Sequence, residues 1–166
     1  MNDQYGGKSA ISGGSGGNGG GRQLVTIRLG NQMIGLPIEK VHDVFFPSNF
    51  TPVPLAMKQI AGVLNLRGRI VTIIDLSIIM GLSAVNEEIG ERPAVGVICA
   101  DESYGLLTDT LGEVVTLGDD LLEANPVNLD PCWAQLSLGT YRLENELLVV
   151  LDIDTLIDTL LKKDAA

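Results

Sequence analysis

The stretch GVLNLRGRIVTIIDL, residues 62–76, decides the fold. Two apolar runs meet at Arg67-Gly68-Arg69, a pattern typical of two strands joined by a tight turn. The second run, Ile70–Leu76, is almost unbroken in its apolar character and predicts a strand. Residues 77–82 then predict a short helix that ends near Gly81.

The stretch recurs later in the chain. Residues 70–76 match residues 147–153 at an offset of 77, and residues 23–44 match residues 93–114 at an offset of 70. The second match aligns Gly35-Leu36 with Gly105-Leu106, where both glycines indicate strand positions too tight for a side chain. The repeat predicts a mainly β fold with two similar subdomains, each too small to be stable alone, burying apolar faces against one another as short barrels.

The remaining segments set the boundaries. Residues 1–22 are rich in glycine and serine and predict a flexible tail, while 23–161 form the folded domain. A polar linker is expected near 83–93. Residues 156–161 have helical apolar spacing and predict a terminal helix, with 162–166 as a C-terminal tail.

Composition excludes several classes of protein. The net charge of -10 opposes binding to nucleic acid or to an anionic membrane surface, since both require clustered cations. No apolar run is long enough to span a bilayer, and no secretory signal is evident, so we expect a cytoplasmic protein without membrane insertion. Cys99 and Cys132 match no metal or redox motif.

No catalytic or metal-binding set can be assembled, and no cofactor is indicated. His42 is the only histidine, which leaves no histidine-rich metal site. No spacing in the sequence assembles a Ser-His-Asp triad around it. Asp75 and Asp152 each end an apolar strand before a short helix, which favours helix capping. A small enzyme that uses an acidic pair in a barrel cleft remains an alternative.

Arg67 is the strongest candidate for recognition. The repeat places Glu144 at the equivalent turn, so the shared fold does not require an arginine there. A planar, permanently charged guanidinium on a tight turn suits recognition of a protein partner. A salt bridge with Asp43 or Glu39 is the alternative. Arg69 is interpreted as its solvated companion.

These motifs together resemble the CheW family of chemotaxis coupling proteins over residues 23–161. The resemblance is carried by Gly35-Leu36-Pro37-Ile38, Val41-His42-Asp43-Val44, Gly62–Gly68, Ile73–Leu76, Gly105–Asp109 and Leu148–Asp152. It implies two five-stranded SH3-like barrels around a shared core. It also implies a non-enzymatic adaptor that binds a CheA-type histidine kinase and the cytoplasmic tips of chemoreceptors.

The same resemblance implies a receptor-binding set. Arg67 falls on the family's receptor-contacting arginine, and Asp43 falls where glutamate is usual; Val41, Val44, Gly62 and Asn65 complete the set. Thr72 departs from the usual proline. The implied receptor site is a groove between the subdomains. A CheW-like scaffold in another kinase-linked pathway, such as pilus motility, is the second alternative.

Overall fold

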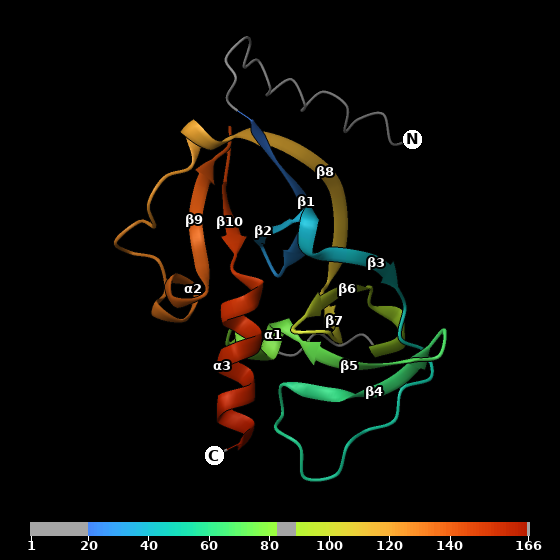
Figure 1. Cartoon of the computed structure of the whole chain (residues 1–166). Helices are drawn as coiled ribbons and strands as arrows, with labels where there is room; N and C mark the ends of the chain where they lie inside the picture. Colours follow the sequence, from blue (N-terminus) through green and yellow to red (C-terminus); the bar gives the residue numbers. More distant parts are fainter. Residues whose placement is uncertain (1–19, 83–88, 166) are drawn as a thin grey trace.

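Residues 20–82 and 89–165, which the computed structural model describes, contain ten strands in two five-stranded sheets (Figure 1). Short helices connect or flank them. The strands are β1 (Gly21–Leu29), β2 (Gln32–Pro37), β3 (Val41–Phe45), β4 (Ile60–Leu66), β5 (Arg69–Asp75), β6 (Ala94–Cys99), β7 (Glu102–Leu107), β8 (Thr110–Gly118), β9 (Ser137–Arg142) and β10 (Leu147–Leu151). The helices are α1 (Leu76–Ile79), α2 (Pro131–Gln135) and α3 (Ile153–Ala165), with 3-10 turns η2 (Ile38–Lys40), η3 (Ile89–Glu91) and η4 (Asp119–Leu121).

The two halves of the chain exchange strands. The first sheet, barrel A, has the order β8-β1-β2-β10-β9, and the second, barrel B, has the order β3-β6-β7-β5-β4. In the repeat, β1 to β5 correspond in order to β6 to β10. Replacing each strand by its counterpart converts the strand order of one barrel into that of the other. The prediction of two similar β subdomains is confirmed, but the expectation that each half forms its own subdomain is wrong. Both sheets combine strands from the two halves, which join at the antiparallel pairs β1·β8 and β3·β6 and at the parallel pairs β2·β10 and β5·β7.

Each barrel is closed by one short bridge after its edge strand. Thr51 and Val63 exchange backbone hydrogen bonds of 2.7 and 2.9 Å in barrel B, and Glu123 and Thr140 exchange bonds of 2.8 and 2.9 Å in barrel A. These bridges occupy equivalent places in the repeat. They pair part of the sheet edges that β3, β4, β8 and β9 would otherwise leave open. The result is two SH3-like barrels.

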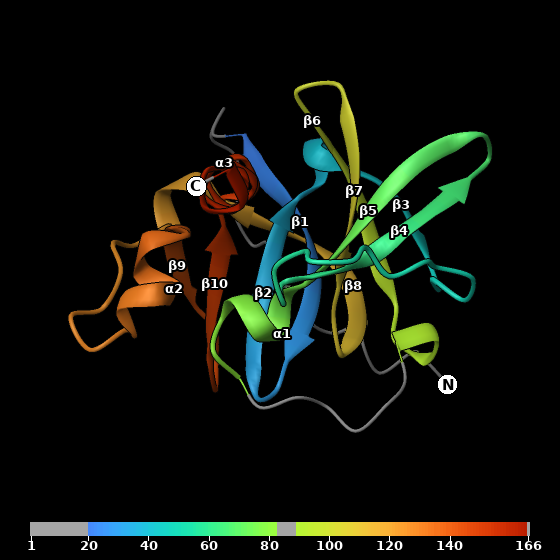
Figure 2. The ribbon, with the colours of Figure 1, turned by 90° about the horizontal axis from the view of Figure 1, so that it is seen from below.

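The apolar core has three parts. The largest cluster lies between the barrels and includes Ile34, Ile74, Leu106, Leu151 and Ile157. Smaller clusters fill the barrels themselves: Leu24, Leu117, Tyr141, Leu148 and Val150 in barrel A, and Val71, Ile73, Ala94 and Leu107 in barrel B. In Figure 2, the two sheets cross and α3 is seen end-on beside the strands of barrel A. Because the largest cluster takes residues from both barrels, neither barrel is an independent folding unit.

Two glycines permit this close packing. A Cβ atom on Gly35 would lie 2.8 Å from Leu148 Cδ2, and one on Gly105 would lie 2.8 Å from Phe45 Cζ. Both distances are shorter than carbon atoms tolerate. The prediction that these positions exclude a side chain is therefore confirmed.

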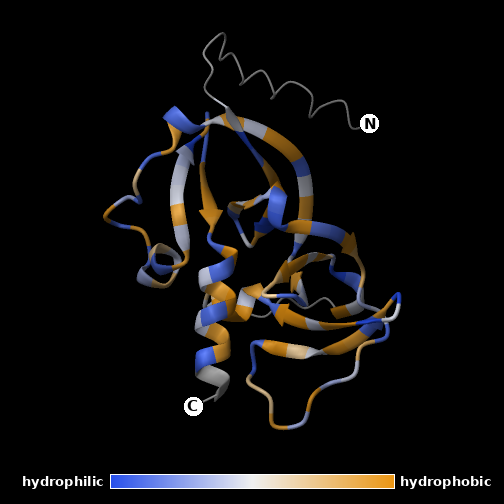
Figure 3. Cartoon of the chain, viewed as in Figure 1, coloured by the Kyte–Doolittle hydropathy of each residue, from blue (hydrophilic) through white to orange (hydrophobic). Residues whose placement is uncertain are grey.

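The C-terminal helix is longer than the sequence pattern indicated. Asp152 accepts hydrogen bonds from Thr155 N at 3.1 Å and from Thr155 Oγ1 at 2.7 Å, so the cap prediction is confirmed and the helix begins at Ile153. It continues through Lys162 to Ala165, which corrects the expected tail. Figure 3 shows hydrophobic and hydrophilic residues alternating along α3, as expected for a helix with one buried face.

The other boundaries also shift. Gly21 and Arg22 belong to β1 because they pair with Gly118 and Leu117 of β8. Residues 1–19 of the expected N-terminal tail and residues 83–88 of the expected linker lie outside the described residues. The end of that linker is not a solvated connection, since Ile89–Glu91 forms a 3-10 turn and both Arg92 and Pro93 are buried.

Candidate functional site

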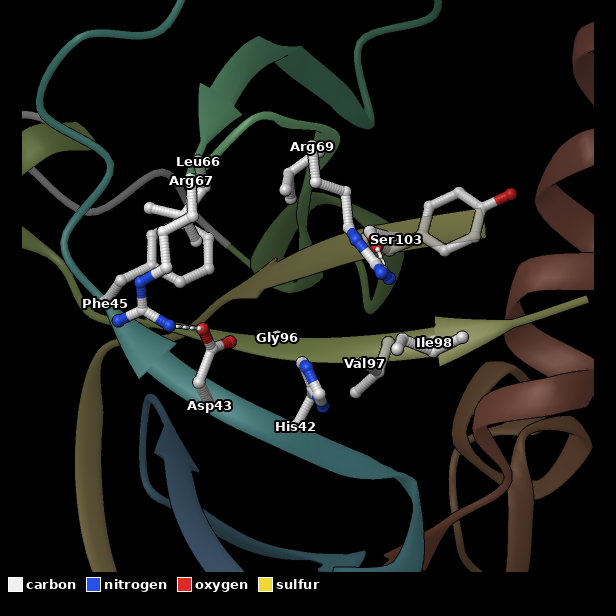
Figure 4. Close-up of a pocket in the computed structure, with 12 residues that line it drawn as sticks. His42, Asp43, Phe45, Leu66, Arg67, Arg69, Gly96, Val97, Ile98 and Ser103 are labelled. Carbon is white, nitrogen blue, oxygen red and sulfur yellow. Dashed lines mark hydrogen bonds and ion pairs between the residues drawn. The ribbon is translucent and has the colours of Figure 1, made fainter. Parts of the chain in front are cut away.

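A pocket of about 220 Å³ opens at one end of barrel B, where all five of its strands contribute residues (Figure 4). Phe45, Leu66 and Val71 give it apolar walls, while Asp43, Arg67 and Arg69 bring charge. Its lining residues all belong to barrel B or to the β4–β5 turn. The pocket is thus a feature of one barrel, whereas the expected receptor groove lay between the subdomains.

Arg67 is held at the pocket by a two-residue turn. Its φ of 54° and the φ of 82° at Gly68 are left-handed values, typical of the turns that join adjacent antiparallel strands. Asn65 stabilises this turn, because its Oδ1 accepts a hydrogen bond from Gly68 N at 2.8 Å. Leu66 and Arg69 are paired across it. The turn fixes the backbone and leaves the Arg67 side chain 78% exposed.

Asp43 faces Arg67 from β3. Arg67 Nη1 lies 3.4 Å from Asp43 Oδ2, and the carboxylate is the less exposed partner at 23%. Of the two acidic partners considered, Asp43 rather than Glu39 is the one observed. Exposed pairs of this kind contribute at most about 1 kcal/mol to stability. The contact therefore orients an accessible guanidinium more than it stabilises the fold.

Gly96 makes room for that carboxylate. The residue lies opposite Asp43 in the β3·β6 pair, and a Cβ atom there would collide with Asp43 Oδ1. No local pattern singles out Gly96, because its role depends on a strand pairing between residues 53 positions apart in the chain.

The other residues of the predicted set differ in accessibility. Val44 is exposed on β3, while Val41 is half-buried against the central core. Gly62 is buried beneath the loop before β4: a Cβ atom on it would lie 2.5 Å from Thr51 O and 2.7 Å from Phe50 Cδ2. The structure thus gives Gly62 a packing role, and it brings Arg67, Asp43 and Asn65 together at the turn.

Four further residues of the pocket were missed as site residues. Arg69 Nη1 donates a hydrogen bond to Ser103 Oγ at 3.3 Å, and Phe45 and Tyr104 add aromatic surface. Burial raises the pKa of the Tyr104 hydroxyl. The β5·β7 pairing is what brings Ser103 beside this end of β5.

A buried ionic cluster joins the two barrels at the end of β5 that lies away from the pocket. Arg92 donates two hydrogen bonds of 3.1 Å to the two carboxylate oxygens of Asp75, and further bonds to Ser77 Oγ at 3.3 Å and Asp109 Oδ1 at 3.4 Å. Asp109 in turn accepts from Gly30 N of barrel A at 2.7 Å. Asp75 also caps α1 by accepting from Ser77 N at 3.0 Å, as predicted. No local pattern in the sequence marks Arg92, because its two acidic partners lie 17 positions away, one on either side.

A second polar cluster ties α3 to barrel B. Lys40 Nζ lies 2.7 Å from Asp154 Oδ2, and Cys99 Sγ donates to Asp154 Oδ1 at 3.3 Å. The Lys40 ammonium lowers the pKa of Asp154, whose carboxylate in turn raises the pKa of Lys40. Burial, followed by the hydrogen bond to Asp154, raises the pKa of the Cys99 thiol.

The pocket offers one carboxylate, Asp43, and that group faces an arginine rather than a second acid. The paired-carboxylate alternative therefore finds no support there. In the two described segments, no group of three or more histidine, cysteine, aspartate or glutamate side chains is arranged to hold a metal ion. No helix among the described residues has the length and apolar character to cross a membrane.

Comparison with known proteins agrees with this geometry. The sequence profile of the CheW-like domain matches residues 23–161. The chemotaxis protein CheW of Thermotoga maritima is 26% identical over 145 residues, which cover 86% of this chain and 91% of that protein. The chemotaxis protein CheW of Rhizobium meliloti is 26% identical over 136 residues, which cover 82% and 87%.

A solved structure shares the fold. The scaffolding protein TtCheW from Thermoanaerobacter tengcongensis superposes with a TM-score of 0.70 at 23% identity, covering 79% of this chain and 84% of that one. Since the matched profile spans most of the chain and the two intertwined barrels agree with that fold, the chain belongs to the CheW-like domain family.

Proposed function

We propose that this protein is a non-enzymatic adaptor that couples chemoreceptor tips to a CheA-type histidine kinase on the cytoplasmic side of the membrane. Membership of the CheW-like domain family supports the adaptor role, as do the chemotaxis names of its relatives. The observation that carries the proposal is the presentation of Arg67 at the mouth of the barrel B pocket, exposed and oriented by Asp43.

The receptor contact is assigned to this end of barrel B. A helical hairpin from a receptor would meet the Arg67 guanidinium, the Asp43 carboxylate and the exposed Val44 side chain. The turn fixes the backbone at Arg67, and the planar guanidinium fork forms directional hydrogen bonds with carboxylates or carbonyl oxygens. The pair would therefore contribute specificity more than raw affinity.

The kinase contact is assigned to the sheet edges. Apolar strand edges of this kind suit pairing with a similar barrel domain of the kinase. On the edge strand β8 of barrel A, Leu111 is 39% and Val114 is 50% exposed. That edge belongs to the other barrel from the Arg67 pocket, so one molecule would engage both partners. Each contact would be modest alone and would gain strength through multivalency in an array.

The test is a calorimetric titration of the purified chain against the CheA-type kinase and a trimerised receptor-tip fragment from the same organism. The proposal expects saturable binding to each and a ternary complex when both are present. Absence of both contacts would contradict it. If the chain binds only the kinase or receptor of another kinase-linked pathway, it is an adaptor of that pathway instead.

A further inference from the structure

Arg69 occupies a different position from Arg67 in the pocket. It begins β5 on the far side of the turn, and Figure 4 shows its guanidinium beside Ser103, while Arg67 reaches toward Asp43. Two arginines at one pocket are notable in a chain with only 11 Lys and Arg against 21 Asp and Glu.

The two guanidinium groups differ in how they are neutralised. Arg67 has Asp43 as its ionic partner, whereas no ion pair joins Arg69 to a carboxylate in the described part of the chain. The hydrogen bond from Arg69 goes to the neutral hydroxyl of Ser103. Asp101 and Glu102 line the hollow on the outer side of Arg69, so they balance its charge only at longer range. A guanidinium has five N–H donors, which leaves several of them free for an acceptor in the pocket.

Barrel A shows that the fold does not require a cation at this place. Under the 77-residue offset, Glu146 is the counterpart of Arg69 and Glu144 that of Arg67. The geometry agrees, because Leu143 N donates to Glu146 O at 2.8 Å across the β9–β10 turn, as expected of the counterparts of Leu66 and Arg69. Glu146 is held by Arg28 through two hydrogen bonds of 3.1 and 2.8 Å. The equivalent turns of the two barrels therefore carry side chains of opposite charge.

The surroundings of Arg69 fit a carboxylate on an apolar stem. Leu66, Val71 and Val97 line the pocket together with the aromatic rings of Phe45 and Tyr104. Arg69 is itself exposed, so these walls exclude water from a bound carboxylate on the pocket side only. That partial shielding strengthens a charge-assisted hydrogen bond.

We propose that Arg69 and Ser103 form a carboxylate-accepting subsite that selects a receptor segment carrying an aspartate or glutamate beside an apolar residue. The proposal rests on the receptor role proposed above. In it, Arg67 with Asp43 orients the segment at the mouth, and Arg69 with Ser103 accepts its carboxylate inside the pocket.

The first test measures coupling between the two proteins. Arg69→Gln removes the positive charge and shortens the side chain while keeping it polar, and it should weaken binding of the receptor-tip fragment about threefold to tenfold. One aspartate-to-asparagine or glutamate-to-glutamine change in the tip should produce the same loss, and Arg69→Gln should add nothing to it. Arg142→Gln, which removes an exposed arginine of barrel A paired with Glu123, is the matched control and should leave binding unchanged. Two results would overturn the proposal. One is equal binding by Arg69→Gln and the native chain. The other is that the loss caused by Arg69→Gln adds to the loss caused by neutralising each acidic residue of the tip in turn.

The second test does not depend on the receptor. The probes are two capped tripeptides, Leu-Glu-Leu and Leu-Gln-Leu, titrated to millimolar concentration against the isotope-labelled chain. The glutamate peptide should shift the amide resonances of Arg69, Ser103 and Gly96 in the native chain and not in Arg69→Gln. Equal shifts from both peptides would show that no carboxylate is selected. Selective shifts in a chain that binds no receptor tip would support the subsite while contradicting the proposed function.

Discussion

Arg92 and Asp75 form a buried ion pair in which two guanidinium nitrogens lie 3.1 Å from the two carboxylate oxygens. Asp75 ends β5, and Arg92 lies just before β6, so the pair fastens the two halves of the chain where barrel B is assembled from both. Through Asp109 and Gly30, the same cluster reaches barrel A. The pocket lies at the other end of β5. One of its strands is therefore anchored at its far end by the Arg92–Asp75 ion pair.

Removing the Arg92 charge should strongly destabilise the protein. In Arg92→Met, Asp75 and Asp109 would be left close together without their cation in a region where Arg92 is only 3% exposed. Breaking such a pair costs about 3–5 kcal/mol. Urea unfolding followed by circular dichroism should report that loss. Arg142→Met, which breaks an exposed pair of similar length, should change the unfolding free energy by less than about 1 kcal/mol. Equal stability of the two variants would show that the cluster does not fasten the fold.

Gly62→Ala should destabilise the fold by about 1–3 kcal/mol, because its methyl group would push against Thr51 O and separate the bridge between Thr51 and Val63. Thermal unfolding measures the change. Gly90→Ala serves as the control, since the nearest atom to its added Cβ is at 3.5 Å, an ordinary contact. A loss of receptor binding by Gly62→Ala without any loss of stability would instead assign Gly62 a direct contact.

The pair of Lys40 and Asp154 should give a stability contribution that depends on pH. The Lys40 ammonium lowers the pKa of Asp154, so this contribution is present above the unfolded-state pKa of aspartate, about 3.9, and is lost as the pH falls through the folded value. Hydrogen bonding to Asp154 raises the pKa of Lys40, so its contribution is present below the unfolded-state pKa of lysine, about 10.4, and is lost as the pH rises through the folded value.

Lys40→Met should therefore be less stable than the native chain at neutral pH, and the difference should shrink as the pH falls below about 3.9. Both side chains are more than a third exposed, so solvent screening limits the difference to under about 1 kcal/mol. Chemical unfolding at pH 3, 7 and 9 measures it. A difference that stays constant from pH 7 to pH 3 would show that lost packing of the Lys40 stem, rather than its charge, is responsible.

The sequence predicted the parts of the fold that depend on neighbouring residues. The hairpin turn at Arg67, the two tight glycines and the caps at Asp75 and Asp152 all follow from short patterns. The exchange of strands does not, because apolar runs carry no local mark of which run they pair with. Arg92 shows the same limit: beside Glu91 and Pro93 it reads as part of a polar linker, and only the folded positions of Asp75 and Asp109 make it a buried residue.

The candidate site divides in the same way. Arg67 was identified because the turn chemistry and its replacement by Glu144 in the repeat are both visible in the sequence. Arg69, Ser103 and Gly96 were missed because the β5·β7 and β3·β6 pairings bring them to one pocket. Gly62 was assigned to the binding set on resemblance, whereas its packing against Phe50 and Thr51 appears only in three dimensions.

The central claim is that one molecule engages its two partners through separate faces, and Arg67→Glu tests it most directly. The matched variant is Arg142→Glu, which reverses an exposed arginine 3.2 Å from Glu123, much as Arg67 lies 3.4 Å from Asp43. Titrations of both variants against the receptor-tip fragment and against the kinase should show receptor binding lost in Arg67→Glu alone, with kinase binding kept in both. Receptor binding that survives Arg67→Glu in a folded protein, or is lost equally in Arg142→Glu, would contradict the account.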